Sequence, residues 1–343
     1  VYADVGLDPN FGDGGLVTNN SVTGINCAWS IGIDSQERII VAGDVNDNLS
    51  VVRFDTSGSP DSSFSGDGIV QTSITGVNVD VRSCVIDSDD RIYLAGSFQD
   101  GSSVDFALVR YLENGDLDPD FGNSGIVSTD ILSSDIGESC AIDRSTGRVI
   151  VAGQTSDLTY GYFAVACYEA SGDLDTEFGT DGIVTTHFGK KQDHAYSCAI
   201  DSKGRIVVAG IATNESFGSD FGVARFLASG DLDESFDNDG LVITDLTGTA
   251  DRSQSCVVDS NDRVLVAGRV ANPDQDFALA RYLQNGDLDT SFGNGGVVIT
   301  DFAGEWDDAY SVVIDHEGRI LVAGYANFPE EGINCDFALA RYL

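Results

Sequence analysis

The chain has 343 residues, of which 42% are hydrophobic and 40 are glycine, so it can bury a large core and form many tight turns. Its 56 Asp and Glu against 18 Lys and Arg give a formal net charge of −38. This charge excludes nucleic acid and anionic membrane as partners, because both require a basic surface. No apolar run reaches the ~18 residues of a membrane-spanning helix, so no membrane insertion is expected.

Two sequence markers recur six times along the chain with one spacing. A string close to Arg-Ile-x-Val-Ala-Gly ends at Gly43, Gly96, Gly153, Gly210, Gly268 and Gly324. A string close to Leu-Asp-x-x-Phe-Gly places Phe at 11, 64, 121, 178, 236 and 292. Both markers advance by 53, 57, 57, 58 and 56 residues. Two independent markers with the same period indicate tandem structural repeats.

Each repeat contains four short apolar segments bounded by Gly, Asp, Asn or Ser, which is the pattern of β-strands. In the fourth copy these are residues 196–201, 205–210, 220–227 and 240–244. Four antiparallel strands per unit, repeated radially, predict an all-β, six-bladed β-propeller. We expect a single domain over residues 1–343, with repeat copies at about 6–58, 59–115, 116–172, 173–230, 231–286 and 287–343.

The two ends of the chain complement each other. The sequence ends with a third-strand segment, residues 336–343, and starts just before a fourth-strand segment, Gly15–Thr18. We therefore expect the N-terminal strand to complete the sixth blade and close the ring. The chain begins at Val1 and contains no Met, as after signal-peptide removal or trimming, and we expect a secreted or cell-surface protein.

These strings resemble the delta-60 repeat family of bacterial β-propellers. The resemblance rests on the Leu-Asp-x-x-Phe-Gly, Arg-Ile-x-Val-Ala-Gly and Asp-Phe-Ala-Leu-Ala-Arg-Tyr strings and covers essentially the whole chain. It implies the propeller fold and no particular activity. The rhythm is also similar to NHL-type propellers, and this similarity implies that the strand carrying the repeated Ser is innermost.

Most repeated side chains are assigned to the fold. Each Arg of the second marker follows an Asp by four or five residues, which predicts structural Asp–Arg pairs. The marker Phe residues are expected between blades, and the six repeated Ser are expected to make structural hydrogen bonds. Four cysteines share one repeat position on an apolar strand face and are expected to be buried free thiols: Cys84, Cys140, Cys198 and Cys256.

The turn that contains the marker Phe is acidic. An Asp lies three residues before Phe in all six copies, and a second Asp lies two residues earlier in four of them. Alternating carboxylates suggest calcium, although Phe replaces the glycine of an EF-hand loop and no bidentate Glu follows. The alternative is that each Asp caps its own turn. The candidate calcium ligands are Asp116, Asp118, Asp173, Asp175, Asp231, Asp233, Asp287 and Asp289.

The residues just before each repeated Ser break the repeat symmetry. If their strand is innermost, they lie at one mouth of the central channel, where a mixture of aromatic and polar groups predicts a binding site. The alternative is ordinary variation of solvated loops. The candidate ligand-binding residues are Trp29, Arg82, Glu138, His194, Tyr196, Arg252, Asp308 and Tyr310.

No catalytic residues are identified, and the sequence leans away from an enzyme. We expect a secreted or cell-surface binding or structural scaffold for protein or glycan partners, with no required cofactor and calcium as a candidate ligand. The first alternative is a metal-dependent hydrolase or lactonase at the channel mouth. The second is a self-assembling extracellular component whose acidic faces are bridged by divalent cations.

Overall fold

The computed structural model describes residues 8–18, 26–46, 48–74, 77–101, 103–157, 159–189, 192–213, 218–271, 274–302, 306–327 and 335–343. These residues form 23 strands in six antiparallel sheets and no helix, so none of them forms a helix that could cross a membrane.

The sheets follow one another in chain order. The first contains β1 (Asn26–Ile33), β2 (Ile39–Val45), β3 (Asn48–Phe54) and β4 (Ile69–Thr72), and the second contains β5 (Asn78–Ile86), β6 (Ile92–Asp100), β7 (Ser103–Tyr111) and β8 (Ile126–Thr129). The third contains β9 (Ser134–Ile142), β10 (Val149–Ser156), β11 (Gly161–Tyr168) and β12 (Ile183–Thr186), and the fourth contains β13 (His194–Ile200), β14 (Ile206–Thr213), β15 (Ser219–Phe226) and β16 (Leu241–Thr244). The fifth contains β17 (Arg252–Val258), β18 (Val264–Ala271), β19 (Gln275–Tyr282) and β20 (Val297–Thr300), and the sixth contains β21 (Asp307–Ile314), β22 (Ile320–Asn327) and β23 (Cys335–Tyr342).

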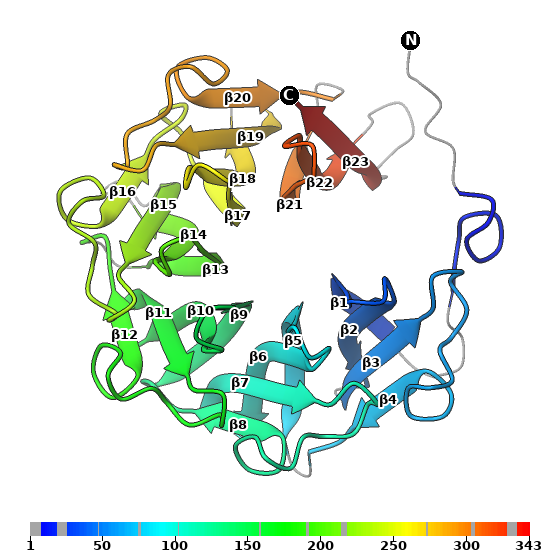
Figure 1. The fold of residues 1–343 in the computed structure, drawn as a ribbon. Helices are drawn as coiled ribbons and strands as arrows, with labels where there is room; N and C mark the ends of the chain where they lie inside the picture. Colours follow the sequence, from blue (N-terminus) through cyan, green and yellow to red (C-terminus); the bar gives the residue numbers. More distant parts are fainter. Residues whose placement is uncertain are drawn as a thin grey trace.

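The sheets are the blades of a six-bladed β-propeller. Figure 1 shows them around a central axis, with the first strand of each sheet innermost and the fourth strand outermost. The predicted fold class and strand order are therefore confirmed. Because the predicted repeat copies start at the acidic turn, each copy from residue 59 onward holds the fourth strand of one sheet and the first three strands of the next.

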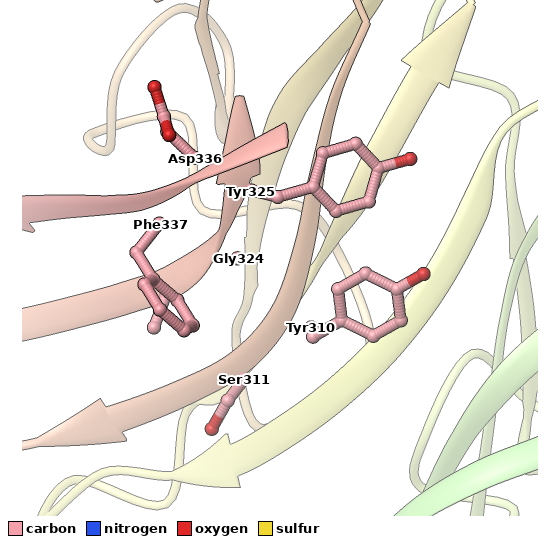
Figure 2. Close-up of a pocket in the computed structure, with 7 residues that line it drawn as sticks. Tyr310, Ser311, Gly324, Tyr325, Asp336 and Phe337 are labelled. Atoms are coloured by element: carbon pink, nitrogen blue, oxygen red, sulfur yellow. The ribbon is translucent and has the colours of Figure 1, made fainter. Parts of the chain in front are cut away.

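The sixth sheet has three strands in the described part of the chain, so the predicted pairing of Gly15–Thr18 with β23 is not among its contacts. The N-terminal segment 8–18 lies beside β3 and β4 instead (Figure 1), where Gly12 N donates to Ser57 O at 2.7 Å. Gly122 N, which precedes β8 of the second blade, makes the same contact with Ser171 O of the third blade. The N-terminal turn thus docks on the first blade, whereas Phe337 of β23 stays exposed beside Tyr310 and Tyr325 (Figure 2).

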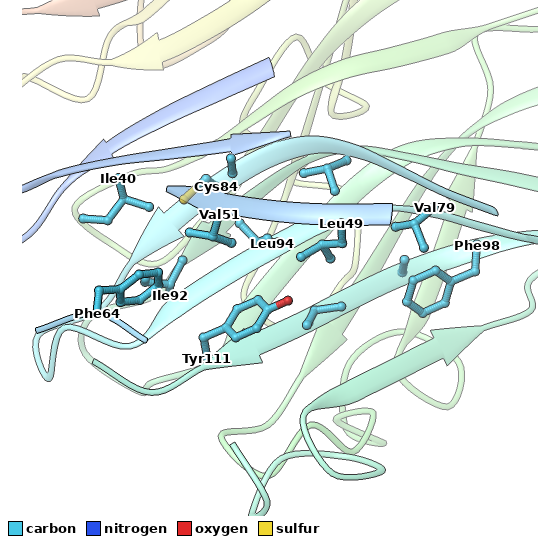
Figure 3. Close-up of a cluster of buried hydrophobic side chains, with 14 residues drawn as sticks. Ile40, Leu49, Val51, Phe64, Val79, Cys84, Ile92, Leu94, Phe98 and Tyr111 are labelled. Carbon is cyan, nitrogen blue, oxygen red and sulfur yellow. The ribbon is translucent and has the colours of Figure 1, made fainter. Parts of the chain in front are cut away.

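The apolar core lies between neighbouring blades. In the first of these cores, Leu49 and Val51 of β3 pack with Val79 of β5 and Leu94 of β6, and the marker residue Phe64 is completely buried (Figure 3). Full burial of one such ring contributes about 2–3 kcal/mol. Phe121, Phe178, Phe236 and Phe292 are also buried, which confirms the inter-blade role predicted for the marker.

Pairs of Asp and Arg stabilise the turns within the blades. The Arg of the second marker bonds the Asp that precedes it, as in Arg205–Asp201 at 2.5 Å. The Arg of the third strand bonds the Asp of the acidic turn and lies over the marker ring. Arg110 Nε is 2.8 Å from Asp118, and its guanidinium carbon is 4.3 Å from the centroid of Phe121. These contacts confirm the structural assignment of both Arg sets.

Candidate binding site at the channel mouth

A β-bulge in every blade positions the candidate binding residues. Along β1 and β2, Ala28 pairs with Gly43 and Ser30 pairs with Ala42, so the residue between Ala28 and Ser30 has no partner across the strands. The same shift occurs in all six inner hairpins. A bulge redirects the side chain of its extra residue. The six extra residues are Trp29, Arg82, Glu138, Tyr196, Gln254 and Tyr310.

The Gly of the second marker makes these bulges possible. A Cβ on Gly43 would lie 1.9 Å from the carbonyl oxygen of Cys27, and a Cβ on Gly96 would lie 1.9 Å from that of Asp80. The bulged strand therefore passes so close to this position that only glycine fits. The repeated Gly permits the bulge, and the bulge places a different side chain near the axis in each blade.

Five of the eight predicted binding residues line one cavity of about 660 Å³, and they come from the inner strands of the first four blades: Trp29, Arg82, Glu138, His194 and Tyr196. The cavity contains an aromatic–cation pair, in which the guanidinium carbon of Arg82 lies 5.1 Å from the Trp29 ring centroid. Arg82 also bonds Asp80 at 2.7 Å, and Trp29 Nε1 donates to Asp44 Oδ1 at 2.6 Å. Trp29 keeps about half of its surface exposed at 49%, so its ring remains available for stacking.

Two titratable groups of the cavity have shifted pKa values. Burial raises the pKa of Glu138 to about 7, an effect that the charge of Arg82 opposes and that of Asp80 reinforces. Burial, and then the charge of Arg252, lowers the pKa of His194, so this imidazole is neutral at pH 7. His194 stacks on Tyr196 with ring centroids 6.3 Å apart, and Tyr196 accepts a hydrogen bond from Arg252 Nη2 at 3.1 Å. Glu138 can therefore exchange a proton near neutrality inside a cavity of mixed polar and apolar lining.

The other three predicted residues lie outside the lining of this cavity. Arg252 borders it through its bond to Tyr196. Asp308 is buried and pairs with Arg269 at 2.8 Å, and burial raises its pKa against the opposing charges of Arg269 and Arg252. Tyr310 lines a separate pocket of about 480 Å³ on the sixth blade, where its ring lies beside that of Tyr325 at 6.0 Å (Figure 2). The single predicted site is thus divided between two places.

The sequence analysis missed a second set of lining residues on the second strands. Asp44, Ser97 and Gln154 directly follow the marker Gly and line the cavity. The corresponding Arg269 holds Asp308, and the corresponding Tyr325 contacts Tyr310. A signal for them exists in the sequence, because the residue after the marker Gly changes in every copy while the marker itself does not.

The predicted calcium ligands are hydrogen-bonded within their own turns. Asp118, Asp233 and Asp289 each bond a third-strand Arg at 2.8–2.9 Å, and each also accepts from a backbone N–H two residues ahead. In the third copy Cys167 replaces that Arg, and Arg148 bonds Asp175 at 3.0 Å. The other four predicted ligands each accept a hydrogen bond from a nearby Ser or Asn side chain: Asp116, Asp173, Asp231 and Asp287. These contacts favour the turn-capping alternative, and calcium in these turns stays a prediction.

The fold and the axial cavity define a tandem-repeat β-propeller. Residues 38–64, 88–121, 144–178, 204–236 and 260–292 match the family described as "Domain of unknown function (DUF5122) beta-propeller". These matches support a bacterial family of β-propeller repeats. No curated protein matches the sequence.

Several solved structures share the fold. A protein of unknown function from Dyadobacter fermentans is similar with a TM-score of 0.56 and 13% identity, over 92% of this chain and 94% of that one. The periplasmic gluconolactonase of Pseudomonas aeruginosa has a TM-score of 0.54 and 14% identity over 92% and 88%. Virginiamycin B lyase from Staphylococcus aureus has a TM-score of 0.53 and 9% identity over 92% and 84%. At these identities the similarity shows the fold alone.

Proposed function

We propose that this propeller is a non-enzymatic binding protein that takes a small polar ligand, of the carbohydrate class, into the axial cavity. The observation that carries the proposal is the pairing of a half-exposed Trp29 ring with several hydrogen-bonding side chains in a cavity of about 660 Å³. An aromatic face stacks on the apolar face of a sugar ring, and carboxylates and amides bond its hydroxyl groups. Asp44, Asp80, Gln99 and Gln154 supply such groups in the lining of the same cavity.

The charges of the cavity disfavour an anionic ligand. The Arg82 cation is already paired with Asp80, and His194 is uncharged at pH 7. Among the described residues, the Asp44 carboxylate accepts only from the neutral Trp29 Nε1 group, so the lining has a net negative charge that is compatible with a neutral sugar. Glycan binding also suits the secreted or cell-surface location that we infer from the net charge of −38. We further infer that the repeats are of the delta-60 type.

The two tryptophans of the chain provide the test. We would titrate the protein with a panel of monosaccharides and oligosaccharides and follow binding by calorimetry and tryptophan fluorescence. Trp29→Ala should weaken the affinity for a bound sugar at least tenfold. Trp306→Ala, at an exposed position outside the cavity lining, should leave it unchanged. A panel without any bound sugar, or equal affinities for the two variants, would refute the proposal.

One observation favours a second candidate, a hydrolase or lactonase. Glu138, with its pKa near 7, has the property of a general acid or base at neutral pH. The metal-dependent form has less support, because the clusters of three carboxylates among the described residues lie at the seams between blades and not in this cavity. Assays with lactones would detect the activity. Glu138→Gln should then lose at least a hundredfold in rate, whereas the exposed Glu177→Gln should lose none.

Assembly through divalent cations remains the third proposal from the acidic composition. Light scattering during an EDTA titration tests it, because bridged particles should dissociate as the cation is removed. Unchanged particle size would exclude cation bridging.

A further inference from the structure

Three carboxylates meet at the seam between the fifth and sixth blades, away from the axial cavity. Asp276 lies at the start of β19, Asp301 follows β20, and Asp307 begins β21. One oxygen from each lies within 4.8 Å of the others.

Asp307 differs from an ordinary member of an acidic cluster, because one of its carboxylate oxygens is buried and lacks a normal hydrogen bond. Its side chain is 0% exposed, and its Oδ2 accepts from Phe302 N at 2.8 Å. Its Oδ1 is buried and has no hydrogen bond of normal geometry. The backbone N–H of Asn327 lies near this carboxylate but donates its well-aligned hydrogen bond to Trp306 O at 3.1 Å. A buried carboxylate oxygen without a donor or a cation is strongly unfavourable.

A second oxygen without a partner lies at the same end of the β21–β22 hairpin. Asp307 pairs with Ala326 across the two strands, so Asn327 is the next residue beyond that pair. The Oδ1 atom of Asn327 is buried and also has no hydrogen-bond partner. Carboxylate and amide oxygens are the ligands that Ca²⁺ prefers.

The equivalent seam between the third and fourth blades shows what the fold itself requires. There Tyr162 and His187 occupy the positions of Asp276 and Asp301, and only Asp193 is acidic. Asp193 accepts from Phe188 N at 2.7 Å and from Thr213 N at 2.9 Å, so both of its oxygens are satisfied. The blade seam therefore forms with a single carboxylate. The second and third carboxylates at the last seam add repulsion that the fold does not need.

Two other seams carry three Asp, and in both of them each oxygen of the Asp at the start of the innermost strand accepts a hydrogen bond. Asp135 accepts from Thr155 Oγ1 and from two backbone N–H groups, and Asp251 accepts from Thr247 Oγ1 at 3.0 Å and from Leu246 N at 2.7 Å. In both seams a threonine hydroxyl donates to this carboxylate and offsets part of its negative charge. We therefore expect a cation at the seam between the fifth and sixth blades and not at these two.

We propose that Asp276, Asp301 and Asp307 form a calcium site that links the fifth and sixth blades. The charge of the three carboxylates is matched by a divalent cation, and the flexible coordination of Ca²⁺ suits an irregular set of oxygens better than the octahedral demand of Mg²⁺. The bound ion holds β21 against the ends of β19 and β20. This site is independent of the ligand in the axial cavity.

The test uses the full chain, freed of metal with EDTA. Trp306 directly precedes Asp307 and can sensitise the luminescence of bound Tb³⁺, which Ca²⁺ then displaces. We expect Ca²⁺ to compete at least tenfold better than Mg²⁺ and to raise the Tm by several degrees. Asp301→Asn should weaken Ca²⁺ binding at least tenfold and abolish this rise. Asp301 is exposed, and the substitution removes repulsion, so the variant should fold.

Two control variants separate this site from other acidic places. Asp130→Asn changes the equivalent position of the seam between the second and third blades, and Asp287→Asn changes an acidic turn. Both should bind Ca²⁺ as the unmodified protein does. The proposal is overturned if calorimetry detects no Ca²⁺ binding, if Asp301→Asn binds with unchanged affinity, or if only Asp287→Asn loses the ion.

Discussion

Gly153 on β10 lies directly against Ile136 on β9, and a Cβ at Gly153 would come within 2.0 Å of the Ile136 carbonyl oxygen. The two residues flank the bulge that presents Glu138 to the axial cavity. This contact recurs in all six blades and connects the most regular part of the sequence with the most variable one.

Gly153→Ala should therefore destabilise the protein by about 3 kcal/mol, because the added methyl group forces two paired strands apart. Gly147→Ala is the matched control. Its Cβ would meet no atom within 4 Å, so it should lose only the ~1 kcal/mol associated with its positive φ of 78°. Urea denaturation of both variants measures the difference, and equal losses would contradict the close-approach argument.

Arg148 should be more important to stability than the other Arg residues of the second marker. In the third copy Cys167 occupies the position of the third-strand Arg, and Arg148 bonds Asp175 at 3.0 Å instead. Arg148→Ala leaves Asp175 buried without this ion pair and should cost about 3 kcal/mol. Arg91→Ala, at a more exposed pair, should cost ~1 kcal/mol or less.

Cys167→Arg should recover much of the stability of the Arg148→Ala variant, because it restores the third-strand pair of the other blades. Chemical denaturation of the single and double variants tests both statements. A double variant no more stable than Arg148→Ala would show that Asp175 does not require the ion pair.

Glu138 should make stability depend on pH. Its pKa rises from an ordinary value of 4.5 to about 7 in the folded protein, so the folded state retains a proton that the unfolded state has released. Stability contributed by this group should fall as the pH rises from about 4.5 to 7 and then level off, by about 3 kcal/mol in total. Glu138→Gln should remove this component. Thermal unfolding of both proteins between pH 4 and 8 would show it, and parallel profiles would contradict it.

The four equivalent cysteines should be inert in the native protein. Cys84, Cys140, Cys198 and Cys256 are buried free thiols, and burial raises the pKa of Cys198 to about 11 and that of Cys140 to about 12. Because the thiolate is the reactive form, a thiol reagent should modify them at least a thousandfold faster after unfolding. Among the six cysteines whose side chains the structure describes, Cys27 is partly exposed and should react first, and Cys27→Ser should remove its phase. Rapid modification of the native Cys27→Ser protein at any of the four would disagree with the burial.

The N-terminal segment should stabilise the whole ring. Gly12 docks on Ser57 of the first blade, while Phe337 and Leu339 of β23 are exposed, although the equivalent Phe277 and Leu279 are buried against the sixth blade. Deletion of residues 1–20 removes the contact of Gly12 with the turn between β3 and β4 and should therefore lower the Tm of the protein. A loss confined to the last blade in hydrogen exchange would argue for an open array.

The sequence alone determined the fold, because two markers with one period leave few architectures that bury the apolar faces of short strands. It also determined which repeated side chains serve the fold, since Arg38 and its equivalents carry an Asp at a constant distance in all copies but the third. Five of the eight predicted cavity residues, Trp29 to Tyr196, were recognised because they break a repeat that is otherwise regular.

Only the tertiary structure decided which side chains share a space. The bulge at Trp29 and the close approach at Gly43 depend on the register of two strands, which composition does not reveal. Asp276, Asp301 and Asp307 come from three strands of two blades, and each looks like an ordinary turn residue in the sequence. Their proximity follows from the packing of blade against blade, and so does the missing hydrogen bond of Asp307, because burial and pairing are properties of the folded ring.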